Sequence, residues 1–418
     1  MVRVKNKLGR GALSRRGGWS RLDNRIKLST HKGRWLVGVG DELTGASLSS
    51  DLSRGAARRT YHTLDGMRGL AALTVVSIHA PWMFGKATML HAYSAVDLFF
   101  VLSGFVLAHA YDRRFDDGMT VFQFMKLRLI RLYPMYLAGV LFSAGWIVIH
   151  LVQGLPVTLL QHQPWTWEHL RIALQYNLFF VPNPQLGAGP PALYALNIPA
   201  WSLMFEILIN LAFASLWPRL TTFSLGVLVA VFAVWMTWAG LNHGSLNAGF
   251  EFRFLDIAAA RVCFGFFAGV LIYRLSGHAP AWLKVPPLIL LAVIVAAFYW
   301  TPTGKTLAWY DIGLDLVLIP LLVFLGSRVE PGRWTRPAYS FGGRTSYGVY
   351  AIHYPLYYAA TVWFTKAGYD SAAHAPISGI ILLAGLMTLA WLLDRYYDGP
   401  VRAWLTRRRS AEPVPAVS

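Results

Sequence analysis

Residues 220–250 read LTTFSLGVLVAVFAVWMTWAGLNHGSLNAGF and contain no Asp, Glu, Lys or Arg. A helix needs about 20 mostly apolar residues to cross the hydrocarbon core of a bilayer, so this stretch is long enough to do so. Apolar stretches of this kind recur from residue 61 onward and cover residues 67–86, 94–111, 132–152, 200–217, 222–241, 256–275, 286–301, 311–326, 345–365 and 376–394. Strands of a membrane β-barrel would instead alternate apolar and polar residues in short segments. The continuous apolar pattern therefore predicts an all-α, polytopic membrane protein with ten transmembrane helices.

The composition of the whole chain excludes an ordinary soluble protein. Of its 418 residues, 55% are hydrophobic and 14% are charged, whereas a soluble domain carries about 25% charged residues. So few charges cannot cover a surface that faces water. The single cysteine, Cys263, also excludes an internal disulfide framework and a cysteine-based structural zinc site.

The basic residues predict the orientation of the chain. The net charge is +18, and residues 1–60 alone hold 14 Lys/Arg against four Asp/Glu. We interpret residues 1–60 as a disordered basic tail in the cytosol, close to an anionic leaflet rather than bound to nucleic acid. With this tail inside, the inner loops and the C-terminal segment hold 17 Lys/Arg and the outer loops five, in line with the positive-inside rule. The sequence thus predicts two cytosolic termini, a transmembrane domain over residues 61–395 and a short basic tail over 396–418.

Charged and titratable residues inside the apolar spans are candidate site residues, because such groups are costly in a membrane. Arg68 and His79 are eleven residues apart on the first span, which places them on one helix face about 16 Å apart along the axis. We expect Arg68 at the cytosolic end and His79 deeper, toward the outer half. The alternative is that Arg68 extends to the headgroups and His79 only hydrogen-bonds a neighbouring helix.

The second span carries one carboxylate and two small residues. Asp97 lies near its outer end, and two interpretations remain open: a cap of the helix start, or a role beside His79. Ser103 is a candidate site residue, although close packing of the Ser103–Gly104 pair against a neighbouring helix accounts for most of its expected role.

The cytosolic segment after the second span carries Arg128 and Arg131 at positions i and i+3, so their guanidinium groups share a helix face. Such a pair binds phosphates through bidentate hydrogen bonds. The alternative is an interfacial amphipathic helix that contacts anionic lipid.

The fourth span has a polar stripe in which Ser202 and Glu206 are four residues apart. Glu206 is the stronger candidate, because packing rarely explains a buried carboxylate. Arg261 in the sixth span and His353 in the ninth are further candidates. The sequence contains no Walker-type phosphate loop, no histidine pair at metal-ligand spacing and no Gly-x-Ser-x-Gly motif, so we expect no metal and no ATP-driven or serine-hydrolase chemistry.

Five motifs, in this order and at these membrane depths, resemble the acyltransferase-3 family. They are LDGMRG at 64–69 followed by His79, VDLFFVLSGF at 96–105, RLIRLYP at 128–134, WSL at 201–203 followed by Glu206, and TSYGVYAIHYP at 345–355. Trp201 opens the fourth motif. The family comprises bacterial integral-membrane O-acyltransferases that act on surface polysaccharides, O-antigens, nodulation factors and some antibiotics. The resemblance covers residues 60 to 395.

This resemblance implies an O-acetyltransferase-like enzyme of the bacterial cytoplasmic membrane. It implies acyl-CoA, commonly acetyl-CoA, as the cytosolic donor and a saccharide or glycolipid acceptor such as O-antigen or exopolysaccharide. It also implies a catalytic role for Arg68 and His79 and donor binding by Arg128 and Arg131. The family often has two acidic residues after its Trp-Ser-Leu motif, whereas Ile207 follows Glu206 here. The chain ends about 24 residues after its last span, so we expect the form without an extracytoplasmic hydrolase-like domain.

The residue pattern and the family resemblance together predict one mechanism. The arginines bind the CoA phosphates, and the thioester reaches His79, which acts as a general base or, alternatively, as a nucleophile that takes the acyl group first. Glu206 or Asp97 orients the imidazole or binds the acceptor. The rival hypothesis is a non-enzymatic transporter or flippase in which the same charges relay protons; a membrane-anchored basic scaffold would leave those charges unexplained.

Overall fold

The computed structural model describes residues 28–31, 34–37, 59–154, 165–183, 192–277 and 284–407. The chain separates into two units, residues 1–60 and residues 61–418. In the first unit, β1 (Leu28–His31) and β2 (Arg34–Val37) form an antiparallel hairpin. Residues 1–27, 32–33 and 38–58 of the predicted basic tail, and the C-terminal residues 408–418, lie outside the described residues.

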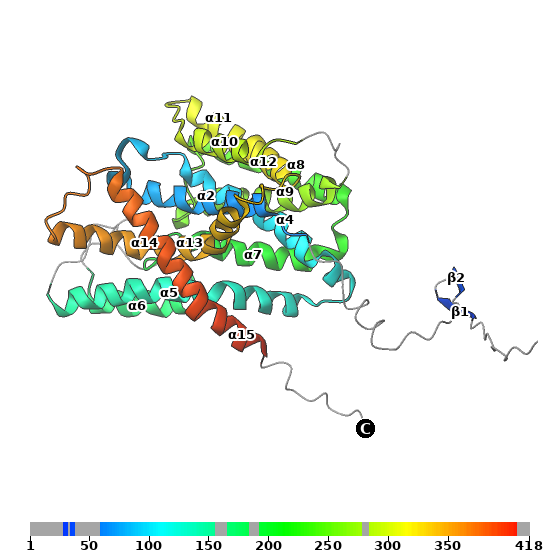
Figure 1. Ribbon diagram of the computed structural model, residues 1–418, viewed down its shortest axis with the longest axis horizontal. Coiled ribbons are helices and arrows are strands. Elements are labelled where there is room, and N and C mark those ends of the chain that lie inside the picture. Colours follow the sequence, from blue (N-terminus) through cyan, green and yellow to red (C-terminus); the bar gives the residue numbers. More distant parts are fainter. Residues whose placement is uncertain are drawn as a thin grey trace, which may run out of the picture. The chain divides into compact units, whose positions relative to one another are not determined.

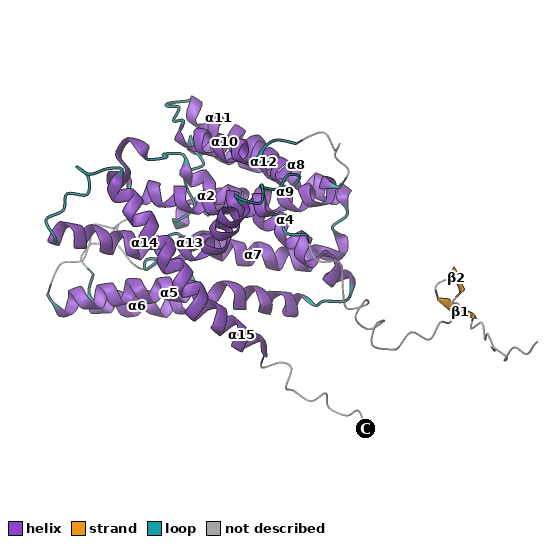
Figure 2. Cartoon of the chain, in the orientation of Figure 1, coloured by secondary structure: helices purple, strands orange, loops and turns teal. Residues whose placement is uncertain are grey.

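The described part of the second unit is helical (Figure 2). Its helices are α2 (His62–His79), α3 (Pro81–Phe84), α4 (Ala95–Asp116), α5 (Val121–Val152), α6 (Trp167–Leu178), α7 (Ala200–Leu216), α8 (Thr222–His243), α9 (Leu255–Ser276), α10 (Pro287–Tyr299), α11 (Thr306–Gly313), α12 (Ile319–Gly326), α13 (Arg336–Lys366), α14 (Ile377–Leu393) and α15 (Gly399–Arg407). Seven helical stretches in the described residues are long and apolar enough to cross a membrane, and α10 is a shorter apolar helix. An all-helical, multi-pass membrane architecture is thereby confirmed.

Local sequence signals set several helix ends. Thr120 and Gln123 form a capping box at the start of α5. The first predicted span, 67–86, is too long at its C-terminal end, because α2 ends at His79 and Pro81 starts a separate turn. Proline has no backbone N–H to continue the helical hydrogen bonds. His79 is therefore the last residue of α2 and not a residue within a longer helix.

At the other end of the chain, the predicted break after residue 394 is absent. A π-helical turn, Asp394–Asp398, joins α14 to α15, so the two helices form one long rod (Figure 1). Arg402 contacts both Asp394 and Asp398, at 3.1 and 2.8 Å. These ion pairs bridge the turn and extend helical structure into the segment that the sequence suggested was a tail.

Helix α2 packs most extensively against α13, although the two are far apart in sequence. The helices cross closely at two glycines: a Cβ atom on Gly69 would lie 2.7 Å from the Cα atom of Gly342. About three turns further along each helix, His79 meets His353. Since both contacts follow in the same order along the two helices, α2 and α13 run parallel.

Helices α4 and α9 also run parallel. Asp97 pairs with Arg261 near their N-terminal ends, and Gly104 packs directly on the carbonyl group of Phe266 further along. The close packing predicted for Gly104 is confirmed.

Helix α5 runs parallel to α13 and antiparallel to α7. The contacts that set these directions are Leu132 with Tyr347, Gly139 with Ala351, Arg128 with Glu206, and Gly139 with Asn197. The predicted phosphate-binding residues Arg128 and Arg131 and the predicted third span, 132–152, all lie in α5 and form one continuous helix.

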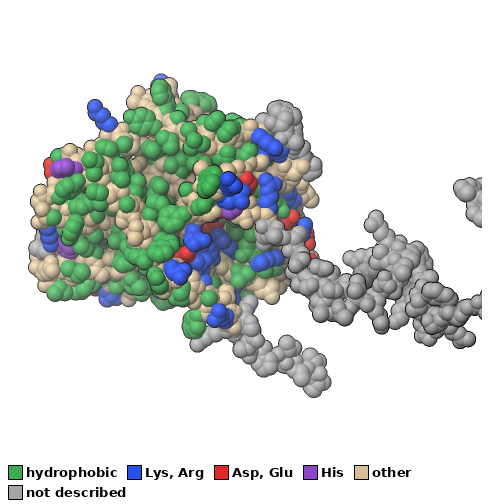
Figure 3. All heavy atoms as spheres, in the orientation of Figure 1, with side chains coloured by type: hydrophobic (Ala, Val, Ile, Leu, Met, Phe, Trp, Pro, Cys, Tyr) green, Lys and Arg blue, Asp and Glu red, His purple; other side chains and the backbone are tan. Residues whose placement is uncertain are grey.

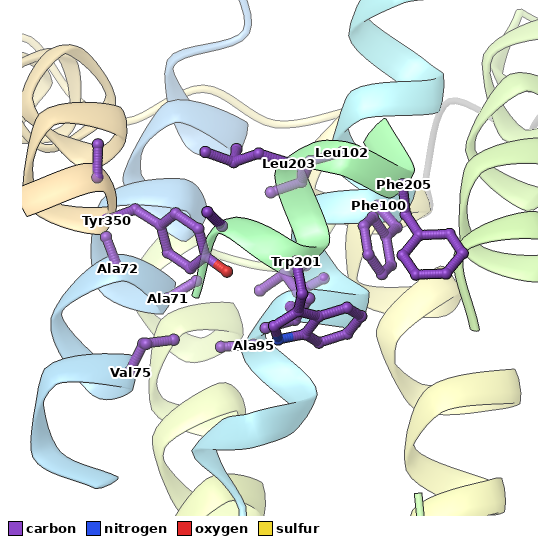
Figure 4. Close-up of a cluster of buried hydrophobic side chains, with 14 of the residues drawn as sticks. Ala71, Ala72, Val75, Ala95, Phe100, Leu102, Trp201, Leu203, Phe205 and Tyr350 are labelled. Carbon is purple, nitrogen blue, oxygen red and sulfur yellow. The ribbon is translucent and has the colours of Figure 1, made fainter. Parts of the chain in front are cut away.

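Figure 4 shows a cluster of buried apolar side chains from α2, α4, α7 and α13, which belongs to a larger core that also includes residues of other helices. Trp201 of α7 packs edge-on against Phe100 of α4, and Ala71 of α2 and Tyr350 of α13 lie nearby. On the outside, α8, α10 and α14 expose large apolar side chains such as Val234, which suits contact with lipid tails. On the face seen in Figure 3, Lys and Arg side chains gather in one region beside acidic groups, and much of the remaining face is apolar.

Candidate active site

Nine of the eleven predicted site residues line two adjoining cavities, and the other two, Asp97 and His353, line neither. The first, here called the arginine cavity, has a volume of ≈ 220 Å³ and is lined by Arg68, Val96, Phe99, Phe100, Ser103, Val106, Leu107, Arg128, Arg131, Leu132, Ser202, Leu203, Glu206, Gly343, Ser346, Tyr347 and Tyr350. The second, here called the histidine cavity, has a volume of ≈ 90 Å³ and is lined by Val75, Ile78, His79, Ala92, Tyr93, Val96, Ile198, Pro199, Trp201, Asn247, Ala248, Phe250, Arg261 and Tyr350. Val96 and Tyr350 belong to both walls, so they separate the two cavities.

The arginine cavity brings together three cations that the sequence singled out, namely Arg68, Arg128 and Arg131. Arg128 pairs with Glu206 at 3.0 Å, and Ser103 donates a hydrogen bond to the same carboxylate oxygen. The wall of the cavity contains these three guanidinium groups and one carboxylate, while Arg68 and Arg131 also contact carboxylates that do not line it, Asp65 at 3.4 Å and Asp398 at 3.6 Å. The cavity can therefore attract a multiply charged anion.

Arg131 differs from Arg128 in its surroundings. Its guanidinium group lies 3.6 Å from the buried carboxylate of Asp398 and 5.3 Å from the ring centre of Tyr347. Asp398 also pairs with Arg402 of α15. The C-terminal helix thus contributes to the surroundings of the cavity, which the sequence did not suggest. Asp398 and Arg402 are four residues apart, and this spacing could have predicted an ion pair on a helix.

His79 is partnered by another histidine. Its Nδ1 atom lies 2.9 Å from the carbonyl oxygen of Val75 and 3.3 Å from Nε2 of His353. The expectation that Glu206 or Asp97 orients this imidazole is wrong, because those carboxylates are held by Arg128 and Arg261. The residue facing His79 comes instead from α13.

Asp97 has a charged partner that the sequence did not suggest. It lies in the first turn of α4, but Arg261 binds both of its oxygens, with contacts of 2.5 to 3.2 Å. Arg261 also donates to the carbonyl oxygen of Ala248 at 2.7 Å and lies over the ring of Trp201. The ion pair holds Arg261 in the wall of the histidine cavity.

Tyr350, which the sequence did not single out, lies between the two cavities. Its hydroxyl group is 2.6 Å from that of Ser202 and donates to the carbonyl oxygen of Pro199 at 3.0 Å. Ser202 and Glu206 of the predicted polar stripe both line the arginine cavity. The tyrosine is anchored to the start of α7 at the point where the cavities meet.

A further buried polar group lies behind the histidine cavity. Asp311 accepts hydrogen bonds from Tyr93 at 2.5 Å and Ser245 at 2.8 Å, and Asp315 is buried nearby. Both carboxylates lie in the predicted span 311–326, and the sequence did not single them out as candidate site residues. Within the described residues, no group of three or more His, Cys, Asp or Glu is arranged to hold a metal ion.

Comparisons with known proteins show the family of the chain. The acyltransferase-3 family, described as an acyltransferase domain, matches residues 61–395. Acyltransferase MdmB of Streptomyces mycarofaciens is 25% identical over 390 residues, which cover 84% of this chain and 94% of that protein. Peptidoglycan O-acetyltransferase OatA of Listeria monocytogenes is 23% identical over 370 residues, which cover 83% of this chain and 56% of that protein.

One further relative matches a shorter stretch of the chain at a higher sequence identity. Protein 2 in the picA locus of Rhizobium radiobacter is 40% identical over 173 residues, or 41% of this chain and 90% of that protein. No solved structure matches the chain. The family match covers most of the chain and includes the residues of both cavities. The chain therefore belongs to the acyltransferase-3 family and is a multi-pass membrane acyltransferase.

Proposed function

We propose that this acyltransferase moves an acyl group, typically acetyl, from cytosolic acyl-CoA to a hydroxyl group of a saccharide or glycolipid. The observation that carries the proposal is the junction of the two cavities, with cations on one side and an imidazole on the other. An anionic donor and a general base are the two things that acyl transfer from acyl-CoA requires. The peptidoglycan O-acetyltransferase among the relatives supports the choice of acetyl group and saccharide.

The donor would bind through its phosphates at the arginine cavity. Arg68, Arg128 and Arg131 offer planar groups that suit bidentate phosphate contacts. Glu206 and Ser103 would keep Arg128 in place when no donor is bound. From there, the narrow pantetheine arm would pass Val96 and Tyr350 to bring its thioester to His79.

His79 would act as the general base. Its Nε2 atom takes the proton of the acceptor hydroxyl while that oxygen attacks the thioester carbon. The new C–O bond forms, the C–S bond breaks, and the proton passes from Nε2 to the departing sulfur. His79 ends α2, and the C-terminal end of a helix stabilises the positive charge that the ring carries between the two transfers.

The acceptor would reach His79 through the histidine cavity. Trp201 and Arg261 both line this cavity, and the cation of Arg261, which Asp97 holds over the Trp201 ring, would lie beside the acceptor.

For the topology, we propose ten spans with both termini in the cytosol of a bacterial cell. Helix directions support this arrangement. The first, third and ninth predicted spans correspond to α2, α5 and α13, where α13 runs parallel to both others. The second and sixth spans, α4 and α9, also run parallel, as strict alternation requires.

The proposal is tested by reconstituting the protein in proteoliposomes with radiolabelled acetyl-CoA and candidate oligosaccharides. We expect label to appear as an ester on the acceptor, to be lost in the His79→Ala variant and to be kept in His150→Ala. His150 is a matched control, since it is a buried histidine that contacts the carbonyl oxygen of Trp146 and lines neither cavity. Proton-coupled solute uptake without acylation would support the transporter hypothesis, and label on the protein before acceptor is added would favour an acyl-histidine intermediate.

A further inference from the structure

His353 is fully buried, and both of its ring nitrogens have partners on the protein. Its Nδ1 atom lies 2.8 Å from the carbonyl oxygen of Tyr350 and 3.2 Å from that of Val349. Its Nε2 atom lies 3.3 Å from Nδ1 of His79. The ring therefore connects the backbone of α13 to the imidazole of α2.

These contacts determine where the hydrogens lie on His353. A carbonyl oxygen can only accept a hydrogen bond, so Nδ1 of His353 must carry its hydrogen. In a fully buried site, the neutral ring is strongly favoured over the charged one. A neutral ring with hydrogen on Nδ1 presents a lone pair at Nε2.

The hydrogen on His79 follows from two contacts. Nδ1 of His79 faces the carbonyl oxygen of Val75 and the Nε2 lone pair of His353, and both are acceptors. Nδ1 of His79 must therefore be the donor. The neutral ring of His79 then keeps its lone pair on Nε2, the atom that a general base needs.

We propose that His353 is a positioning residue that fixes the tautomer and orientation of His79. The inference rests on the proposed acyl transfer and adds a role for a residue of α13. Val75 alone is a weaker anchor, because its carbonyl oxygen belongs to the same last turn of α2 as the ring that it would hold. A second acceptor from another helix stops the ring from turning over.

His353 neither gains nor loses a proton during the proposed reaction. As Nε2 of His79 takes the acceptor proton, the ring becomes positively charged and its Nδ1–H bonds to Val75 and His353 strengthen. When the proton leaves for the CoA sulfur, the ring returns to the starting tautomer. His353 keeps its own Nδ1 hydrogen throughout.

Two near-isosteric substitutions separate positioning from packing. In His353→Gln, the side-chain oxygen can take the place of Nε2 and accept from His79. In His353→Asn, the amide can take the place of Nδ1 and donate to Tyr350, but the side chain is too short to reach His79. We expect kcat for acetyl transfer to fall about 10- to 100-fold in the Asn variant, with an unchanged KM for acetyl-CoA, and to be largely kept in the Gln variant.

The tautomer is measured directly by nitrogen NMR of the protein labelled with ¹⁵N-histidine, where the His79→Ala spectrum identifies the His79 signals. We expect a protonated Nδ1 and an unprotonated Nε2 in the wild type and in His353→Gln, and a mixture of both tautomers in His353→Asn. Equal kcat values for the two variants, or an unprotonated Nδ1 in the wild type, would overturn the proposal. A wild-type protein that transfers no acyl group would overturn the proposed function, whereas the NMR result would still decide the role of His353.

Discussion

At the scale of single residues, the ion pair of Arg128 and Glu206 has a structural role, and the proposed mechanism gives Arg128 a second role in donor binding. Both side chains are mostly buried and lie 3.0 Å apart in the wall of the arginine cavity. Removal of either partner leaves the other charge unpaired in a poorly solvated place, which costs more than the pair contributes. Stability and donor binding must therefore be separated by experiment.

We predict that Arg128→Gln raises the KM for acyl-CoA at least about tenfold, since a hydrogen bond to a charged group contributes about 1.5–3 kcal/mol. The same change should lower the thermal stability, because Glu206 loses its cation. The double variant Arg128→Gln/Glu206→Gln should regain stability but not donor affinity. If the double variant also regains the wild-type KM, Arg128 does not bind the donor.

A substitution at Val96 can test whether the pantetheine arm passes between the two cavities. It is nearly buried and belongs to both walls. We predict that Val96→Phe lowers kcat at least about tenfold, because a misplaced reacting group easily costs a factor of this size or more. The KM for acyl-CoA should change little. Val106→Phe, which adds the same bulk on the wall of the arginine cavity alone, should instead affect donor binding; a similar loss of kcat in both variants would count against the passage.

At the scale of helices, the crossing of α2 and α13 sets the geometry of the site. The contact between Gly69 and Gly342 brings the backbones together, and the two histidines meet about three turns away. Any side chain at the crossing would force the helices apart. The approach of His79 to His353 therefore depends on two glycines that line neither cavity.

We predict that Gly69→Ala destabilises the protein by about 1–3 kcal/mol, as added bulk does in a packed core, and lowers kcat as well. Gly145→Ala is the matched control, because a Cβ atom there has no neighbour within 4 Å in the interior of α5. In a helix interior, alanine is favoured over glycine by up to about 1 kcal/mol, so this variant should be as stable as the wild type or more so. Equal melting temperatures for the two variants would contradict the close crossing.

At the scale of the whole molecule, the proposed topology places the loop after α4 inside and the loop after α13 outside. The chain has one cysteine, Cys263, so a Cys263→Ala background is free of thiols. In this background, we predict that a membrane-impermeant maleimide labels Lys366→Cys in intact cells, and labels Asp117→Cys only after the membrane is opened. Both positions are exposed to the surroundings in the structure. The reverse pattern would invert the topology.

Much of the architecture could be predicted because lipid constrains sequence strongly. A span must be long and apolar, and all ten predicted spans overlap helices of the structure. Several boundaries differ from the predicted ones, and two of them have local reasons: Pro81 ends the first helix early, and the ion pairs of Arg402 continue the last one. Mean hydropathy is an average over a window of residues, so it does not respond to a single proline or to an ion pair.

The sequence by itself determined the membrane class, the family and the charged residues that line the arginine cavity, because apolar length, charge and motif spacing are local properties. Only the tertiary structure decided which of those residues meet. Asp97 and Arg261 are 164 positions apart, and His79 and His353 are 274 apart. Helical periodicity tells which side chains share a face, but the packing of glycines and core side chains decides which faces touch. Tertiary packing therefore gave His79 a histidine for a partner, where the sequence had suggested a carboxylate.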